Sequence, residues 1–162
     1  MNRHVISLLV KNYSGVLTRV SGLFARRGYN IDSLSVGRTE DPEFSRITIT
    51  LIGDSDITYQ VMKQLEKLQD VKTIIELDPG SSVFRELILV KVQAEPDKRA
   101  LITGIADVFR CRVVDMSKDT MTLELTGDEG KTTALLDMMK EFGIKEIVRS
   151  GLSGIQRGSN VL

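Results

Sequence analysis

The residues best suited to bind a small molecule lie in the turn from the first predicted strand into the first predicted helix, Asn12 to Val16. At a helix start the backbone N–H groups lack partners and the helix dipole is positive, so such a turn can hold a carboxylate. Gly15 lets a ligand approach the backbone closely, and the amide of Asn12 offers both a donor and an acceptor. With Ser14 as N-cap, the same residues also suit an ordinary helix cap, which nearly every helix start carries. The spacing alone leaves both interpretations open.

Groups for catalysis are scarce. The only histidine, His4, lies at the start of the first predicted strand, and no cysteine, histidine or carboxylate cluster has metal-ligand spacing. The run from Ser14 to Arg19 loosely resembles the arginine-bearing loop of small acylphosphatases, but fold-level analogy is weak support. Arg19 falls in the first turns of a well-patterned helix and is more simply a solvated residue. We therefore predict no catalytic residue and no metal site.

Composition narrows the class of protein. Lys plus Arg and Asp plus Glu each total 22, so the net charge is zero and does not favour a nucleic-acid partner. The single cysteine, Cys111, excludes an internal disulfide framework and is best interpreted as a buried small hydrophobic residue. No apolar run approaches the roughly 20 residues that span a bilayer. We expect a cytoplasmic protein without a membrane partner.

Hydrophobic periodicity in the first half predicts the order strand, helix, strand, strand, helix, strand. The first helix has a marked face of apolar residues, and Gly28 suits its C-terminal cap. A second helix follows, capped by Asp54 or Ser55. The four strands are expected at His4 to Val10, Ile31 to Val36, Ile47 to Leu51 and Ile74 to Leu77.

The same order begins again after the breaker-rich segment Asp78 to Ser82, so the sequence predicts a duplicated architecture. The expected strands are Leu87 to Val92, Arg112 to Met116, Met121 to Leu125 and Ile144 to Val148, with helices around 101–108 and 135–142. We predict an α+β protein of two ferredoxin-like βαββαβ modules, at residues 1–78 and 84–162. The glycine-containing tail after Gly151 is expected to be flexible or bound to a partner.

Topology places Asn30, at the start of the second strand, far from Gly15 within one module. Right-handed crossovers put the first and third strands in the middle of the sheet and the second strand on its edge. If two copies pair antiparallel through their second strands, Asn30 of one copy approaches Asn12 and Gly15 of the other. A homodimer would then enclose a pocket, with an apolar wall from Val16, Leu17, Ile31 and Val36.

The sequence closely resembles the ACT-domain regulatory subunits of acetolactate synthase over essentially its whole length. The most specific matches are the Asn-x-Ser-Gly-x-Leu turn at 12–17, the Arg-Gly-Tyr-Asn-Ile run at 27–31, FRELILVKV in the second half and Val148 to Gly151. The resemblance implies that residues 1–78 form an ACT domain for effector binding and dimerisation. Residues 84–162 would be the C-terminal domain of such subunits.

The resemblance further implies a chain that is not itself an enzyme. It would activate a catalytic subunit and confer feedback inhibition by valine or another branched-chain amino acid. The effector would sit between two N-terminal modules, held by the turn containing Asn12, Ser14 and Gly15 and by Asn30. This chain would carry no cofactor, because thiamine diphosphate, Mg²⁺ and FAD would belong to the catalytic subunit. An ACT-type sensor that controls another enzyme or a transcription factor is the remaining alternative, although the neutral charge does not favour DNA binding.

Overall fold

The computed structural model describes residues 2–162 and divides the chain into two compact units. The first unit runs to Phe84 and also contains Leu152–Leu162, whereas the second is Arg85–Gly151. We predicted that these last eleven residues belong with the second domain. They lie with the first unit instead, because Leu152 is buried there beside Val5 and Leu77.

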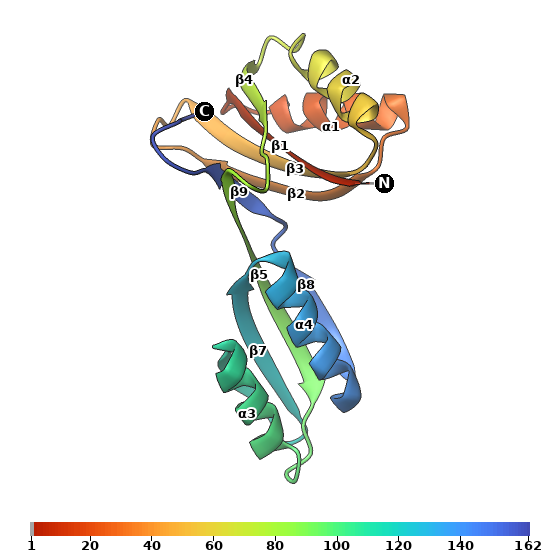
Figure 1. Ribbon diagram of the computed structural model, residues 1–162, viewed down its shortest axis with the longest axis vertical. Coiled ribbons are helices and arrows are strands. Elements are labelled where there is room, and N and C mark those ends of the chain that lie inside the picture. The colour runs from red at the N-terminus through yellow and green to blue at the C-terminus, as the bar shows by residue number, and fades with distance from the viewer. Residues whose placement is uncertain (1) are drawn as a thin grey trace. The chain divides into compact units, whose positions relative to one another are not determined.

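The first unit has the predicted βαββαβ order. Its elements are β1 (Asn2–Lys11), α1 (Val16–Arg27), β2 (Ile31–Arg38), β3 (Phe44–Gly53), α2 (Ser55–Leu65) and β4 (Val71–Glu76). The sheet order is β2-β3-β1-β4, with every neighbouring pair antiparallel, so β2 is an edge strand as predicted. Both helices cover one face of this sheet (Figure 1).

Alternation along the strands explains this packing. Ile6, Leu8 and Val10 of β1 are fully buried and join Val20 and Phe24 of α1 in one apolar cluster. The intervening residues of β1 point to the other face of the sheet, because successive strand side chains alternate. The face of the sheet that no helix covers therefore carries a different set of β1 side chains, which includes the polar Ser7.

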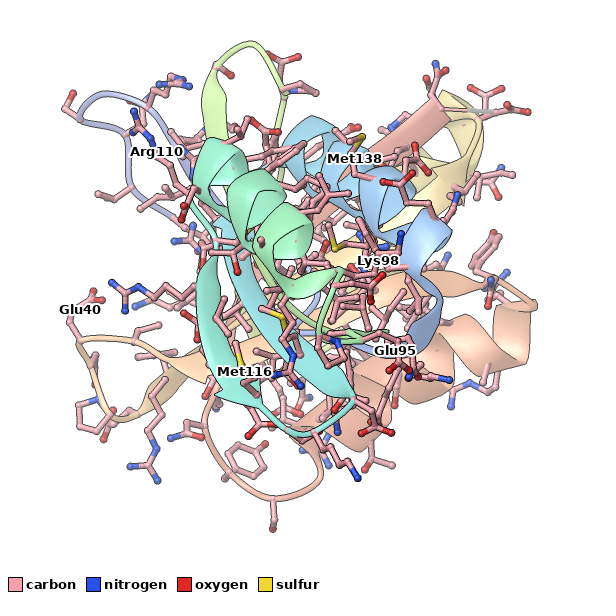
Figure 2. The ribbon with its side chains drawn as sticks, turned by 90° about the horizontal axis from the view of Figure 1, so that it is seen from below. Glu40, Glu95, Lys98, Arg110, Met116 and Met138 are labelled. Carbon is pink, nitrogen blue, oxygen red and sulfur yellow. The ribbon has the colours of Figure 1, made fainter. Side chains whose placement is uncertain are left out.

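The second unit repeats the order. Its elements are β5 (Ser82–Gln93), which begins in the first unit, α3 (Arg99–Phe109), β6 (Arg112–Met116), β7 (Thr120–Gly127), α4 (Glu129–Met139) and β8 (Ile144–Arg149). The strand order is β6-β7-β5-β8. The predicted α+β fold of two βαββαβ modules is thus confirmed. Figure 2 labels Lys98 and Arg110, which flank α3, and Met116 at the end of the edge strand β6.

Capping residues set the ends of the helices, and one helix start differs from the prediction. Helix α4 begins six residues before the first apolar position that marked it, because the carboxylate of Asp128 accepts a hydrogen bond of 2.9 Å from the Lys131 N–H. At the other end of the first predicted helix, Gly28 is the C-cap and adopts the left-handed conformation, as predicted.

The tail packs on the first unit of its own chain, whereas we predicted a tail that is flexible or bound to a partner. Residues Ser153–Gln156 form the short strand β9, and the Ser153 hydroxyl lies 3.3 Å from that of Ser35 on β2. A Cβ atom on Gly154 would lie 2.7 Å from side-chain atoms of Leu77 and Phe84. Only a residue without a side chain therefore allows this close packing.

We expect Gly154→Ala to lower the free energy of unfolding by about 1 to 3 kcal/mol, because the added methyl overpacks the contact with Leu77 and Phe84. Denaturant unfolding measures the change. Gly104→Ala is the control, since a Cβ there meets nothing within 4 Å. Equal stability of the Gly154→Ala and unaltered chains would show that the tail does not pack in this way.

Candidate functional site

Gly15, not Ser14, occupies the N-cap of α1. Gly15 adopts a left-handed backbone conformation with φ of 90°, and no side-chain hydrogen bond caps the helix. The predicted Ser14 cap is therefore wrong by one residue, because the turn requires a backbone conformation that glycine adopts readily. The N–H groups of Leu17 and Thr18 have no acceptor within the helix. Without a side-chain cap, they remain available to an anion.

Asn12 fastens the loop to the β2–β3 connection. Its side-chain Nδ2 donates to the carbonyl of Pro42 at 2.9 Å, and its backbone N–H donates to the carbonyl of Glu43 at 2.7 Å. One amide hydrogen is thus occupied, whereas the other hydrogen and the amide oxygen have no hydrogen-bond partner among residues 2–162. Asn12 both positions the loop and retains groups for a ligand.

A network of side-chain hydrogen bonds to Asp70 fixes the loop between β1 and α1. The Asp70 side chain is 9% exposed and accepts a hydrogen bond of 2.6 Å from Nε of Arg19. The hydroxyl of Tyr13 also donates to Asp70, and the Arg19 guanidinium lies 5.5 Å from the Tyr13 ring centroid. Arg19 is therefore an ion-pair partner and not the simple solvated residue that we predicted. No sequence pattern identified Asp70, because it follows α2 in an irregular segment.

The hydrogen bonds of this network shift the pKa values of Asp70 and Tyr13 in opposite directions. The hydrogen bond from Tyr13 and then that from Arg19 lower the pKa of Asp70, against the opposing effect of burial. The same contact raises the pKa of Tyr13, because losing the phenolic proton would place a second negative charge beside the carboxylate. Asp70 is thus ionised at neutral pH, and it binds Arg19 through Nε.

The guanidinium of Arg19 also covers Gly15. A Cβ on Gly15 would lie 3.3 Å from Nη1 of Arg19. The helix start, its free N–H groups and this cation therefore favour a negative charge at the same place. A carboxylate is the ligand group that these features suit best.

The other predicted site residues divide into three groups. Leu17 and Val36 are 42% and 47% exposed and are free to contact a ligand. Val16 is 3% exposed and belongs to the apolar core, so it does not provide a wall of the pocket. Ile31 is half-buried and packs against that core, and Asn30 is exposed just before it.

The pairing register shows which residues one chain brings together. Lys11, next to the loop, pairs with Phe44, and Arg38 at the end of β2 pairs with Ser45. Ile31 at the start of β2 pairs with Leu51 at the other end of β3. The structure therefore gathers Asn12, Ser14, Gly15 and Leu17 at one end and places Asn30 at the opposite end, as the topology predicted.

Other chemical groups have structural partners. His4 Nδ1 lies 2.6 Å from the Glu76 carboxylate, and Cys111 packs against the core of the second unit, where burial raises its thiol pKa. Among residues 2–162 no group of three or more histidine, cysteine or acidic residues could hold a metal ion. Over the same range, no helix has both the length and the apolar character needed to cross a membrane.

Two protein families match the chain. The family described as "AHAS small subunit-like ACT domain" matches residues 6–73, and "Small subunit of acetolactate synthase" matches residues 85–158. The first match falls within the N-terminal module, and the second covers the C-terminal module and continues through β9. The ACT domain predicted for the N-terminal module is thereby confirmed.

Relatives resemble the chain along nearly all of its length. A protein of Archaeoglobus fulgidus, named "Probable acetolactate synthase small subunit", is 48% identical over 157 residues, or 97% of this chain and 98% of that protein. The acetolactate synthase small subunit of Mycobacterium bovis is 45% identical over 96% of this chain and 92% of its own length. The crystal structure of that subunit from Thermotoga maritima superimposes with a TM-score of 0.88 at 34% identity, covering 99% and 100% of the two chains. The chain therefore belongs to the family of acetolactate synthase small subunits.

Proposed function

We propose that this chain regulates the catalytic subunit of acetolactate synthase and that it binds valine, or another branched-chain amino acid, between two copies of the N-terminal module. It is not catalytic by itself. Thiamine diphosphate, Mg²⁺ and FAD belong in this scheme to the catalytic subunit. The single cysteine suits a reducing compartment, and we expect the assembly to work in the cytoplasm.

The position of β2 at the edge of the sheet is the main support for a site shared by two copies. Asn30 and the loop at Gly15 lie at opposite ends of one module, so a single chain cannot make both contact one ligand. Antiparallel pairing of two β2 strands reverses one copy and brings Asn30 of one beside Gly15 of the other. The exposed Val36 on β2 gives the strand an apolar surface for such pairing.

Recognition of the effector follows from the groups present. The carboxylate would lie against the free N–H groups at the start of α1, beside the guanidinium of Arg19. The amide oxygens of Asn12 and Asn30 would accept from the ammonium group. Leu17 and Val36 would contact a short aliphatic side chain. This arrangement lacks Val16 from the wall that we first predicted, because that residue is in the core.

Regulation would act through a shift between two arrangements of the dimer. Binding of effector to one arrangement changes how the assembly contacts the catalytic subunit, and thermodynamic linkage makes the effect reciprocal. The catalytic subunit must then change valine affinity by the same factor by which valine changes affinity for the catalytic subunit. Coupling of this kind is typically about 5- to 150-fold.

Calorimetric titration tests this scheme. Valine, leucine and isoleucine are titrated into the chain alone and into the chain with its catalytic subunit. We expect one effector per N-terminal interface and a valine affinity that differs between the two preparations. Titrations that show no binding of any of the three would refute the effector site, and identical affinities would refute the linkage to the catalytic subunit.

A further inference from the structure

The tail of the chain packs on the face of the first sheet that no helix covers. At one end Leu152 is buried beside Val5 and Leu77 in a small apolar cluster. The Leu152 N–H approaches the Ser33 hydroxyl at 3.5 Å, which ties the start of the tail to β2. Further along, residues of the tail and of the sheet together line a cavity.

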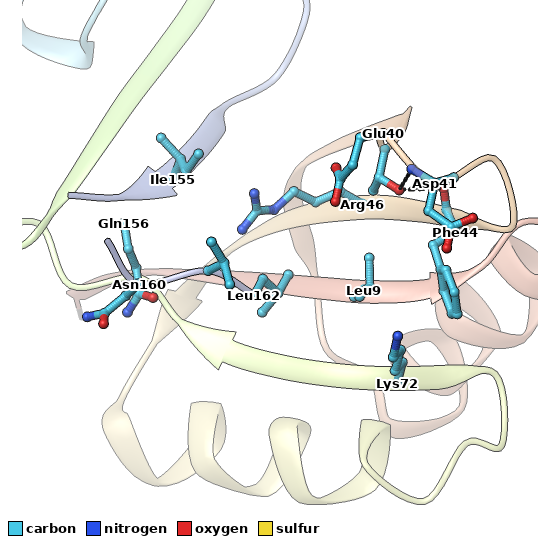
Figure 3. Close-up of a pocket in the computed structure, with 12 residues that line it drawn as sticks. Leu9, Glu40, Asp41, Phe44, Arg46, Lys72, Ile155, Gln156, Asn160 and Leu162 are labelled. Atoms are coloured by element: carbon cyan, nitrogen blue, oxygen red, sulfur yellow. Dashed lines mark hydrogen bonds between the residues drawn. The ribbon is translucent and has the colours of Figure 1, made fainter. Parts of the chain in front are cut away.

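This cavity has a volume of about 410 Å³, a size typical of sites for small molecules. The strands contribute Leu9, Phe44, Arg46 and Lys72, and the tail contributes Ile155, Asn160 and Leu162. Figure 3 shows Arg46 extending from β3 toward Ile155, with Leu9 and Leu162 beneath it. All of these residues lie in the first unit. The cavity is therefore one site formed within one compact unit.

Arg46 is held in place by a hydrogen bond to β1. Its Nε donates to the hydroxyl of the fully buried Ser7 at 2.8 Å, which fixes the plane of the guanidinium. Burial lowers the pKa of Arg46, and the more distant Glu40 offsets only part of that effect. Within residues 2–162, Arg46 forms no ion pair. A partly desolvated guanidinium without a carboxylate partner gains more from an anion than a solvated one does.

Lys72 supplies a second cation at the cavity wall. Its ammonium lies 4.3 Å from the centroid of the Phe44 ring and, like Arg46, has no carboxylate partner among the described residues. Two acidic residues, Glu40 and Asp41, also line the cavity, but both are exposed. Asp41 already accepts a hydrogen bond of 3.0 Å from the Glu43 N–H. Lys72 is exposed as well, so Arg46 is the one charged lining residue that is half-buried, and it lies beside the half-buried apolar residues Leu9 and Leu162.

We propose that this cavity binds a small organic carboxylate with a short aliphatic body. The carboxylate pairs with the two Nη groups of Arg46, and the aliphatic part lies against Leu9 and Leu162. The site shares no residue with the effector loop or with Asn30, so it does not depend on the function proposed above. It is a second ligand site on the opposite face of the sheet from α1.

The test compares two probes of one shape on the full chain. Isovalerate carries the carboxylate, and isovaleramide replaces it with a neutral amide. NMR titration follows the methyl groups of Leu9 and Leu162, which line this cavity. We expect isovalerate to shift both methyl signals and isovaleramide to bind about 10- to 100-fold more weakly, as the loss of one charged hydrogen-bonded pair implies.

Variants then assign the charge. Arg46→Gln is expected to weaken isovalerate binding about 10- to 100-fold. Arg26→Gln removes the same charge from the exposed surface of α1 and is expected to leave the affinity unchanged. Undiminished binding by Arg46→Gln, equal affinity for the two probes, or no shift with isovalerate would each overturn the proposal. If Arg46→Gln fails to fold, the comparison of the two probes on the unaltered chain still decides it.

Discussion

Replacing Gly15 by aspartate is expected to abolish the proposed valine inhibition of the assembled enzyme while the chain still folds. The added carboxylate would occupy the place where the proposed effector's carboxylate binds. A Cβ at this position already lies 3.3 Å from Nη1 of Arg19, so the new carboxylate would also pair with the cation that favours the ligand. Removing two charge-assisted contacts and adding a repulsive charge should weaken valine binding by about 100-fold or more.

The substitution at Gly15 also strains the backbone, which lowers stability, and a control must separate this strain from the effect of the added charge. Gly15 has φ of 90°, which a residue with a side chain adopts at a cost of roughly 1 kcal/mol. Asparagine and aspartate tolerate this conformation comparably and have nearly the same shape. Gly15→Asn is therefore the matched control for strain and bulk.

Two measurements decide between the effects. Calorimetry gives valine affinity for the unaltered chain, Gly15→Asn and Gly15→Asp, and thermal unfolding gives their stability. We expect similar melting temperatures for the two variants, with the weaker binding in Gly15→Asp. Valine inhibition that persists in Gly15→Asp would remove the loop at Gly15 from the effector site.

Local patterns were sufficient to predict the elements and the sheet order. The spacing of Val16, Val20 and Leu23 in one helix, and alternation in the strands, depend only on nearby residues and on the burial of one face. The two-module fold follows from those elements and from right-handed crossovers. The N-cap was misplaced by one residue, because choosing between Ser14 and Gly15 requires the backbone conformation of the turn.

Contacts between distant segments could not be predicted in the same way. Asp70 lies 51 residues from Arg19, in a segment without periodicity, so nothing near either residue indicates their pairing. Arg46 alternates with buried residues of β3 and reads as solvent-facing, because the sequence does not show that the tail covers that face. The supporting network and the second cavity therefore emerge only from the tertiary structure.

Asp70→Asn is expected to lower both stability and effector affinity, because it removes the charge that binds Tyr13 and Arg19. An asparagine keeps the size and one acceptor oxygen, so the fold should persist with a melting temperature lower by several degrees. Arg19, released from its partner, would no longer be fixed over Gly15. We expect valine affinity to fall about tenfold, the loss of one well-placed charged contact.

The pH dependence separates this network from a general loss of packing. The folded chain lowers the pKa of Asp70, so the network's contribution is complete above the pKa of an unfolded aspartate, about 3.9. It is lost as the pH falls below that value, through the lower pKa of the folded state. The unaltered chain should therefore lose stability more steeply than Asp70→Asn on acidification, and the two stability curves should converge at low pH.

Asp137→Asn is the matched control, because the Asp137 carboxylate is 59% exposed and pairs with Lys140, 2.7 Å away on the surface. Exposed pairs of this kind contribute little to stability. Both the melting temperature of Asp137→Asn and its loss of stability on acidification should therefore match those of the unaltered chain. Parallel curves for Asp70→Asn and the unaltered chain down to low pH would contradict the ionised Asp70 network. Tenfold weaker valine binding without a change in acid stability would instead assign Asp70 directly to the ligand.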